Sequence, residues 1–179
     1  MLARGLGNYK WKHDELAGRT IGILGLGTVG KLLAEICLSM HMTVLHHSKS
    51  RKPEWEKKGV KFVDKKTLLT ESDIICLQTP KNVKILEKED FALMKEKILV
   101  NNTLGKAFDE QDFLAWIKDE GNYAIMDGAV EFGFKNVERV VFRDFVSGLT
   151  KEAGERLGKK VKGNLEGFLG GEWRLRESI

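Results

Sequence analysis

Short apolar runs alternate with longer amphipathic stretches along most of the chain. The first run, Thr20–Leu24 (TIGIL), leads into a glycine-rich turn and then into a helical pattern from about Val29 to Met42. This alternation is typical of a parallel sheet covered by helices on both faces. The further strands are expected at Thr43–His47, Val60–Val63, Asp73–Leu77, Ile98–Asn101, Tyr123–Met126 and Val140–Phe142. The pattern therefore predicts an α/β fold with a doubly wound parallel sheet in a single domain.

The stretches between these runs carry apolar residues at helical spacing. The further helices are expected at about Pro53–Lys58, Lys66–Glu71, Asp90–Lys95, Asp109–Lys118 and Lys151–Phe168. In the first helix, five residues at helical spacing are expected to form a stripe that faces the core. They are Leu32, Leu33, Ile36, Cys37 and Met40. We expect residues 15–171 to form the domain, with a lead-in at 1–14 and a tail at 172–179.

Composition and charge exclude several classes of protein. The 30 basic residues are interleaved with 26 acidic ones, so no basic stripe for nucleic acid is predicted. No apolar stretch approaches the ~18 residues of a membrane span, and no secretory signal pattern is present. Cys37 and Cys76 lie in apolar runs and are expected to be buried, without a disulfide. These features favour a cytoplasmic protein that binds no membrane.

The glycine-rich turn carries the clearest chemical signal. Gly25, Gly27 and Gly30 form a GxGxxG motif between the first strand and the first helix, with Thr28 and Val29 inside it. Gly25 permits a tight turn, Gly27 lets a pyrophosphate approach the backbone, and Gly30 allows close packing of helix on strand. The alternative is a purely structural glycine turn. The flanking pattern favours a Rossmann site for NAD(P)(H).

The end of the second strand bears on the choice of dinucleotide. NAD-specific folds place an Asp or Glu there to accept hydrogen bonds from the ribose hydroxyls. This chain has Ser48, followed by Lys49, Arg51 and Lys52. A hydroxyl with neighbouring cations suits a 2′-phosphate, so NADP(H) is favoured over NAD(H). The alternative, an exposed basic turn in an NAD protein that lacks the acid, remains open.

Two neighbouring histidines, His46 and His47, raise the question of a metal site. Successive strand residues point to opposite faces, so the pair could not bind one ion together. Both are therefore interpreted as structural, and no metal is predicted.

Beyond single motifs, the chain resembles the D-isomer-specific 2-hydroxyacid dehydrogenases from about Trp11 to Gly171. Four segments carry the resemblance to the nucleotide-binding domain of that family. They are Glu15–Ala34 (ELAGRTIGILGLGTVGKLLA), Thr67–Pro80 (TLLTESDIICLQTP), Asp90–Glu110 (DFALMKEKILVNNTLGKAFDE) and Asn164–Gly171 (NLEGFLGG). The resemblance implies further cofactor contacts. Thr79 and Pro80 match the turn that lines the adenosine side, Thr103 lies where the nicotinamide is expected, and Asp127 matches the residue that reaches the carboxamide.

The positions of the family's catalytic residues are changed in this sequence. By the resemblance, the Arg that anchors a substrate carboxylate corresponds to Leu104, the Glu to Phe132 and the proton-exchanging His to Phe145. Leucine and phenylalanine can neither bind a carboxylate nor move a proton. The candidate substitutes are Lys106, Glu131 and Asp144, which are also compatible with ordinary surface roles.

The family's substrate domain precedes the nucleotide-binding domain, and only about ten residues precede Trp11 here. The chain is therefore expected to be an excised domain or a natural short paralogue. Its predicted function is binding NAD(P)(H) as the cofactor domain of an oxidoreductase, with hydride transfer to or from a 2-hydroxy or 2-keto acid if a substrate domain is supplied elsewhere. The alternative is a catalytically inactive module that acts as a redox sensor or assembly partner. The resemblance also implies a homodimer formed through this domain.

Overall fold

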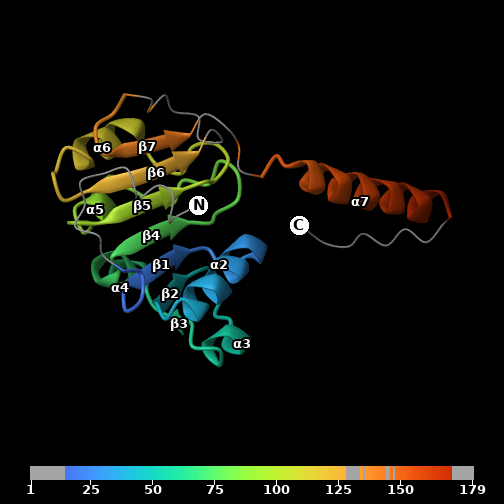
Figure 1. The fold of residues 1–179 in the computed structure, drawn as a ribbon, viewed down its shortest axis with the longest axis horizontal. Helices are drawn as coiled ribbons and strands as arrows, with labels where there is room; N and C mark the ends of the chain where they lie inside the picture. Colours follow the sequence, from blue (N-terminus) through green and yellow to red (C-terminus); the bar gives the residue numbers. More distant parts are fainter. Residues whose placement is uncertain (1–14, 128–133, 135, 144–145, 147, 171–179) are drawn as a thin grey trace. The chain divides into compact units, whose positions relative to one another are not determined.

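The computed structural model describes residues 15–127, 134, 136–143, 146 and 148–170 (Figure 1). The chain divides into two compact units, Met1–Phe145 and Val146–Ile179. The first unit contains the sheet and its covering helices, and the second contains one long helix, α7 (Lys151–Leu169).

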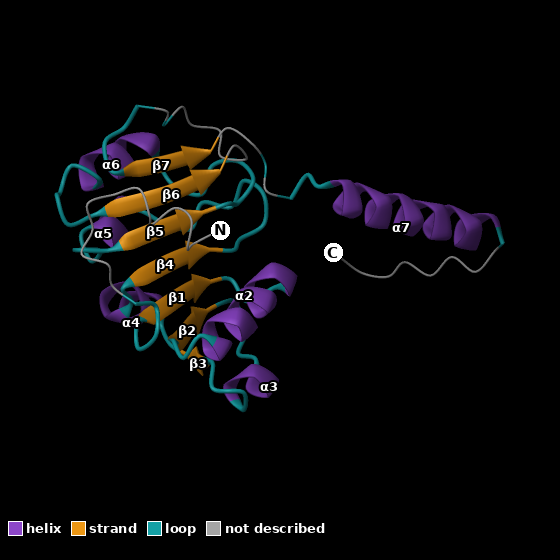
Figure 2. Cartoon of the chain, viewed as in Figure 1, coloured by secondary structure: helices purple, strands orange, loops and turns teal. Residues whose placement is uncertain are grey.

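Seven parallel strands form one sheet in the first unit, in the order β3-β2-β1-β4-β5-β6-β7 (Figure 2). They are β1 (Thr20–Leu24), β2 (Thr43–His47), β3 (Lys61–Phe62), β4 (Ile74–Leu77), β5 (Ile98–Asn101), β6 (Tyr123–Asp127) and β7 (Val140–Arg143). The chain builds outward from β1 to β3, then returns to place β4 on the other side of β1. This order confirms the predicted doubly wound sheet. Ligands of such folds bind outside the carboxyl ends of the strands where the order reverses, here at β1 and β4.

Helices cover both faces of the sheet (Figure 2). The elements are α2 (Thr28–Ser39), α3 (Pro53–Glu56), α4 (Lys65–Glu71), α5 (Lys88–Phe91) and α6 (Glu110–Trp116). One apolar cluster joins α2 and α3 to β1, β2 and β4, and the other joins α4, α5 and α6 to the opposite face. All four residues of β4 are buried, as the unbroken apolar run predicts for a central strand.

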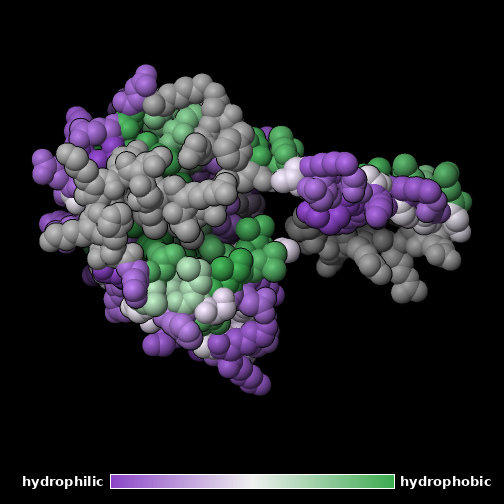
Figure 3. Space-filling model, viewed as in Figure 1, coloured by the Kyte–Doolittle hydropathy of each residue, from purple (hydrophilic) through white to green (hydrophobic). Residues whose placement is uncertain are grey.

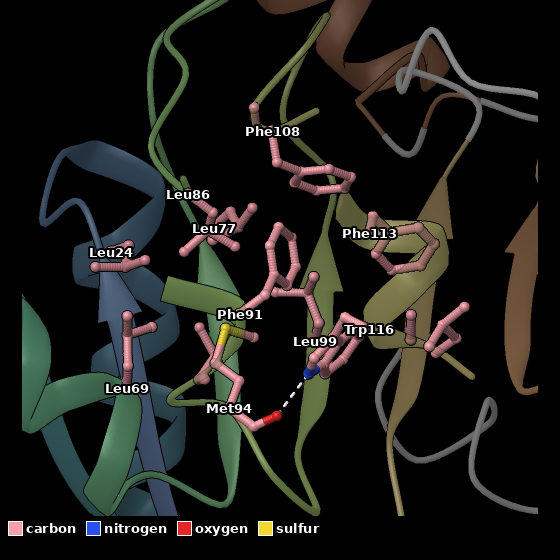
Figure 4. Close-up of a cluster of buried hydrophobic side chains, with 14 of the residues drawn as sticks. Leu24, Leu69, Leu77, Leu86, Phe91, Met94, Leu99, Phe108, Phe113 and Trp116 are labelled. Atoms are coloured by element: carbon pink, nitrogen blue, oxygen red, sulfur yellow. Dashed lines mark hydrogen bonds between the residues drawn. The ribbon is translucent and has the colours of Figure 1, made fainter. Parts of the chain in front are cut away.

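An aromatic cluster fixes the segment that follows β5 (Figure 4). The Phe108 ring stacks on Phe113 with centroids 5.2 Å apart and meets the edge of Phe91 at 5.8 Å. The indole N–H of Trp116 donates to the carbonyl of Met94 at 2.5 Å, so the buried Trp116 has its polar group satisfied. Because Phe108 is buried here, the preceding loop at the carboxyl end of β5 is anchored at one end.

The predicted core-facing stripe of α2 is wrong for three of its five members. Cys37 is buried and Leu33 is partly buried, but Leu32, Ile36 and Met40 are 57%, 56% and 40% exposed. Figure 3 shows hydrophobic surface where α2 lies. The buried face is made of small residues instead, Gly30, Ala34 and Cys37. The reason is the close approach of α2 to β1, which leaves no room for long side chains between them.

The first helix also ends earlier than predicted, at Ser39 rather than Met42. His41 adopts a left-handed conformation with φ of 59°. The His41 N–H donates to the Leu38 carbonyl at 3.0 Å, and the Met42 N–H donates to the Cys37 carbonyl at 3.0 Å. These two bonds form a Schellman motif, which stops a helix while satisfying its last carbonyls.

The predicted helix at Asp90–Lys95 was misplaced, because α5 spans Lys88–Phe91. Asp90 is not the start of the helix: its side chain accepts a hydrogen bond from the Glu87 N–H at 2.7 Å and closes a capping box. The remaining helix predictions agree with the structure to within two residues at each end, as is usual for helix boundaries.

In the second unit, α7 begins after Thr150, whose hydroxyl accepts a hydrogen bond from the Ala153 N–H at 3.1 Å. Its described residues include none that is buried. The exposed apolar side chains of this helix are Leu157, Val161, Leu165, Phe168 and Leu169. Within the described residues, no helix is both long and apolar enough to cross a membrane.

Candidate functional site

The turn after β1 lies where three strand ends meet. Gly25 has a φ of 106°, a conformation that L side chains rarely adopt. Its N–H donates to the His47 carbonyl at the end of β2 (2.9 Å), and a Cβ on Gly25 would lie 2.2 Å from the carbonyl oxygen of Gln78, just beyond β4. Only glycine fits between these two backbones. The turn is therefore fixed to the ends of both neighbouring strands.

Gly30 allows α2 to pack on this turn. A Cβ at Gly30 would lie 2.3 Å from the Gly25 carbonyl oxygen and 3.4 Å from the Ile23 side chain. The absence of a side chain brings the first turn of α2 directly against β1, as the motif predicts.

Gly27 differs from the other two glycines, because a Cβ there would meet nothing within 4 Å. It is the N-cap of α2, and the Lys31 N–H is the first to donate within the helix, to the Gly27 carbonyl at 2.9 Å. The N–H groups of Thr28, Val29 and Gly30 thus have no partner within the helix. Among the described residues, no side chain caps them and no acid lies in the first turn. This open, electropositive end is suited to a phosphate.

A basic turn follows β2. Ser48 is half-buried, and its hydroxyl donates to the Ser50 carbonyl at 2.8 Å. Lys49 is exposed, and the Lys52 ammonium donates to the Ser50 hydroxyl at 3.0 Å. The structure therefore brings Ser48, Lys49 and Arg51 into one turn at the end of the strand next to β1.

Arg51 is held by partners that the sequence did not predict. Its Nε donates to Glu56 Oε1 at 3.0 Å and its Nη2 donates to Glu56 Oε2, a bidentate ion pair. The guanidinium lies 5.6 Å from the centre of the Phe62 ring on β3. The hydrogen bond from Arg51 lowers the pKa of the Glu56 carboxyl and, in return, raises the pKa of the Arg51 guanidinium. Both groups are therefore charged.

The two histidines of β2 have different surroundings. The His47 ring nitrogen Nδ1 lies 3.0 Å from the Val63 carbonyl, while His46 is fully buried and packs edge-on against Phe62. Burial lowers the pKa of His46. In the part of the chain that the structure describes, no group of three His, Cys, Asp or Glu side chains could hold a metal ion.

The loops after β4 and β5 are joined to each other. The Gln78 amide donates to Asn102 Oδ1 at 3.0 Å, and the Asn82 N–H donates to the Leu104 carbonyl at 3.1 Å. Gly105 has a φ of 76°, and a Cβ there would lie 1.8 Å from Asn82 Oδ1. Leu104 is thereby held at a fixed place in the loop, with half of its surface exposed.

Of the four buried polar side-chain atoms that have no partner among the described residues, three lie at or near the carboxyl ends of the strands, and the fourth, Ser72 Oγ, lies at the amino end of β4. Asn101, the last residue of β5, accepts hydrogen bonds from the N–H (3.0 Å) and hydroxyl (2.7 Å) of Thr103, but its Nδ2 has no partner among the described residues. The hydroxyl of Thr79, beyond β4, and Nε2 of His46, on β2, are in the same situation. Unsatisfied buried groups are costly. Those beyond β4 and β5 therefore fit a polar ligand such as a dinucleotide.

The remaining candidate residues are placed as follows. Asp127 is the last residue of β6 and is buried, at the same edge of the sheet. Pro80 is exposed in the loop after β4, and Lys106 is exposed in the loop after β5. Four residues lie outside the described part of the chain: the candidate substitutes Glu131 and Asp144, and Phe132 and Phe145, which stand at two of the family's catalytic positions.

Sequence reasoning missed the residues that connect these loops. Gln78, Asn82 and Asn102 bind backbone or each other across loops that are more than 20 residues apart in sequence. Glu56 belongs to a separate helix. A polar residue directly after a buried strand, such as Gln78, is the signal that could have identified one of them.

The sequence of the chain matches known proteins over this same region. The family described as "D-isomer specific 2-hydroxyacid dehydrogenase, NAD binding domain" matches residues 4–131. A glyoxylate reductase from Thermococcus litoralis is 33% identical over 172 residues, which cover 88% of this chain and 51% of that protein.

Solved structures agree with this match. The apo-structure of D-lactate dehydrogenase from Escherichia coli aligns with a TM-score of 0.79 at 26% identity, covering 93% of this chain and 56% of that one. An acyclic imino acid reductase in complex with NADPH and D-Arg aligns with a TM-score of 0.78 at 27% identity, covering 94% and 57%. The chain thus spans about half the length of the relatives it matches. It belongs to the D-isomer specific 2-hydroxyacid dehydrogenase family, of which it represents the NAD-binding domain.

Proposed function

We propose that this chain binds a nicotinamide dinucleotide across the carboxyl ends of β1 and β4, and that it prefers NADP(H) to NAD(H). The observation that carries the binding proposal is the open space at Gly27, in front of the free N–H groups of α2. The pyrophosphate lies there, between Gly25 and the first turn of the helix. Thr28 and Val29 lie beside it.

The preference for NADP(H) rests on the turn after β2. Ser48 stands at the strand position where NAD-specific folds have a carboxylate, and Arg51 and Lys49 supply positive charge. The NADPH complex of the imino acid reductase supports the proposal, because that protein has a similar fold and sequence. Toward the nicotinamide, we assign the remaining contacts to Thr103 and Asp127, and on the adenosine side to Thr79 and Pro80.

Calorimetric titration of the purified chain with NADPH and with NADH tests this proposal. We expect micromolar binding of both, tighter for NADPH. If neither NADPH nor NADH binds, the domain keeps the fold of its family but does not bind a dinucleotide. Equal affinity for both would contradict the assigned 2′-phosphate site and leave the cofactor domain intact.

Catalysis is proposed only for a complex with a substrate domain. With that domain, the chain would transfer a hydride to or from a 2-hydroxy or 2-keto acid, and glyoxylate is the first substrate to test because of the Thermococcus relative's name. The chain alone should not oxidise NADPH in the presence of glyoxylate. Measurable turnover by the chain alone would mean that Glu131, Asp144 or another residue replaces the family's acid–base group, and that Lys106 or another cation replaces the Arg.

A second candidate function is a catalytically inactive nucleotide-binding module, a redox sensor or assembly partner. The observation that favours it is Leu104, an apolar side chain held half-exposed at the position where the resemblance expects a carboxylate-binding Arg. Adding the isolated substrate domain of a relative to this chain distinguishes the two candidate functions. Restored NADPH oxidation would support the enzyme, and binding without turnover would support the module.

Three finer proposals accompany these. The chain forms a homodimer, which the exposed apolar residues Leu32, Ile36 and Met40 of α2 support, since such stripes mark interaction surfaces. It acts in the cytoplasm, which its two buried free cysteines support. Residues 15–171 form the functional domain. Sedimentation equilibrium tests the dimer, and a monomer at all concentrations would contradict it.

A further inference from the structure

A carboxylate does stand near the end of β2, although the sequence position expected for it holds Ser48. It is Glu56, which comes from α3 and not from the strand. Both of its oxygens accept hydrogen bonds from Arg51. Its charge also acts on the buried His46 of β2, whose Nδ1 lies 3.5 Å from the Ser48 hydroxyl. Glu56 is therefore part of the same cluster as the residues assigned to the 2′-phosphate.

We propose that Glu56 is a second specificity-determining residue, which opposes Arg51 and keeps NAD(H) an acceptable ligand. This inference rests on the proposed function. Two physical effects of Glu56 support it, and both shift the preference toward NAD(H).

The first effect concerns a bound 2′-phosphate. Glu56 occupies two of the five N–H donors of Arg51 and cancels its charge locally. A phosphate must then share the guanidinium with a carboxylate of the same sign as itself. Because the carboxylate and the phosphate bind the same guanidinium, they repel each other, so Glu56 weakens the binding of NADP(H).

The second effect concerns a ribose with a free 2′-hydroxyl. A carboxylate is the acceptor that NAD-binding folds use for the ribose hydroxyls. Glu56 supplies such an acceptor from α3, where the strand end itself has only the hydroxyl of Ser48. Removing this carboxylate should weaken NAD(H) while it strengthens NADP(H).

The opposite role is that Glu56 positions Arg51 for the phosphate. Against this role, Arg51 has a second support, the Phe62 ring on β3, with its centroid 5.6 Å away. The cation–π contact with Phe62 would keep the guanidinium near its place after the ion pair is lost. An ion pair between such partly exposed groups contributes little to order. The charge of Glu56 therefore outweighs its positioning effect.

The test compares Glu56→Gln with the unaltered chain by calorimetry, with NADPH, NADH and the fragments 2′,5′-ADP and 5′-ADP. We expect the ratio of the NADH to the NADPH dissociation constants to rise about tenfold, and the fragment ratio to follow it. A control is Glu54→Gln, which removes a carboxylate from the same short helix where it lies 3.7 Å from Lys31. This control should change neither ratio by more than about twofold.

The outcomes distinguish a failure of the role assigned to Glu56 from a failure of the proposed function. A ratio that stays constant, or that shifts toward NADH, in Glu56→Gln would overturn the role assigned to Glu56. If the unaltered chain binds neither dinucleotide, the proposed binding function itself fails, whatever the variant does. If it binds both equally, the proposed preference for NADP(H) fails and the cofactor domain remains. Arg51→Ala is the internal reference: it should lower the same ratio that Glu56→Gln raises.

Discussion

The turn after β1 and the turn after β2 lie side by side, since the Gly25 N–H donates to the His47 carbonyl, but they are determined in different ways. The conformation of the first turn is fixed by close backbone contacts. Gly25 and Gly30 are required there because other backbone atoms occupy the space that a Cβ on either residue would need. The second is determined by side chains, with Arg51 held between Glu56 and Phe62. On the proposed function, the first turn supplies the ability to bind a dinucleotide, and the second supplies the choice between dinucleotides.

The largest expected effect is at Gly25. Gly25→Ala places a Cβ 2.2 Å from the Gln78 carbonyl oxygen, in a backbone conformation with φ of 106°. We expect the free energy of unfolding to fall by about 2–4 kcal/mol, from backbone strain and overpacking together. Urea denaturation followed by circular dichroism measures this loss. A stability equal to that of the unaltered chain would show that the turn is not constrained by backbone.

Gly27→Val separates binding from folding within the same turn. A side chain there meets nothing within 4 Å, so the melting temperature should fall by less than about 4 °C. Affinity for NADPH and NADH should both fall by about 100-fold, because the branched side chain blocks the N–H groups of α2. Calorimetry measures the affinities. Gly148→Val, at another glycine with open space, is the control and should leave binding unchanged. Undiminished binding in Gly27→Val would contradict the phosphate cradle.

The two turns also differ in how far the sequence predicts them. The roles of Gly25 and Gly30 could be assigned from the motif, since the required backbone geometry is the same wherever strand, turn and helix follow in this order. The ion pair of Arg51 with Glu56 could not, because the sequence does not tell which carboxylate of α3 meets which cation: Glu54 lies near Lys31, and Glu56 pairs with Arg51. The prediction that the apolar stripe of α2 faces the core was wrong for a related reason. Periodicity identifies the apolar residues of a helix but does not tell which of them the sheet can accommodate.

Arg51→Ala is expected to remove the preference for NADPH that we assign to the second turn, without affecting the first turn. Losing a charge-assisted contact to the 2′-phosphate should weaken NADPH by about 10- to 100-fold. NADH should change by less than about threefold, since it lacks the phosphate, and stability should be nearly unaffected because this ion pair is on the surface. Competitive titration with both dinucleotides measures the difference. Equal losses for NADPH and NADH would argue against a 2′-phosphate site and would make the basic turn an ordinary surface feature.

The smallest expected effect concerns His46, which lies under the second turn. Burial lowers the pKa of His46 in the folded chain, whereas in the unfolded chain it titrates near its ordinary value of about 6.5. As the pH falls below that value, the unfolded chain takes up a proton that the folded chain does not. Stability is therefore present above this pH and is lost below it. His46→Phe removes the titrating group, so its melting temperature should fall less between pH 7.5 and pH 5.5 than that of the unaltered chain. His41→Asn, which removes an exposed histidine at a left-handed position that asparagine tolerates, should keep the original pH dependence. If His46→Phe and His41→Asn lose stability in parallel with the unaltered chain, the acid sensitivity arises from other groups, and the buried imidazole of His46 makes no contribution to it.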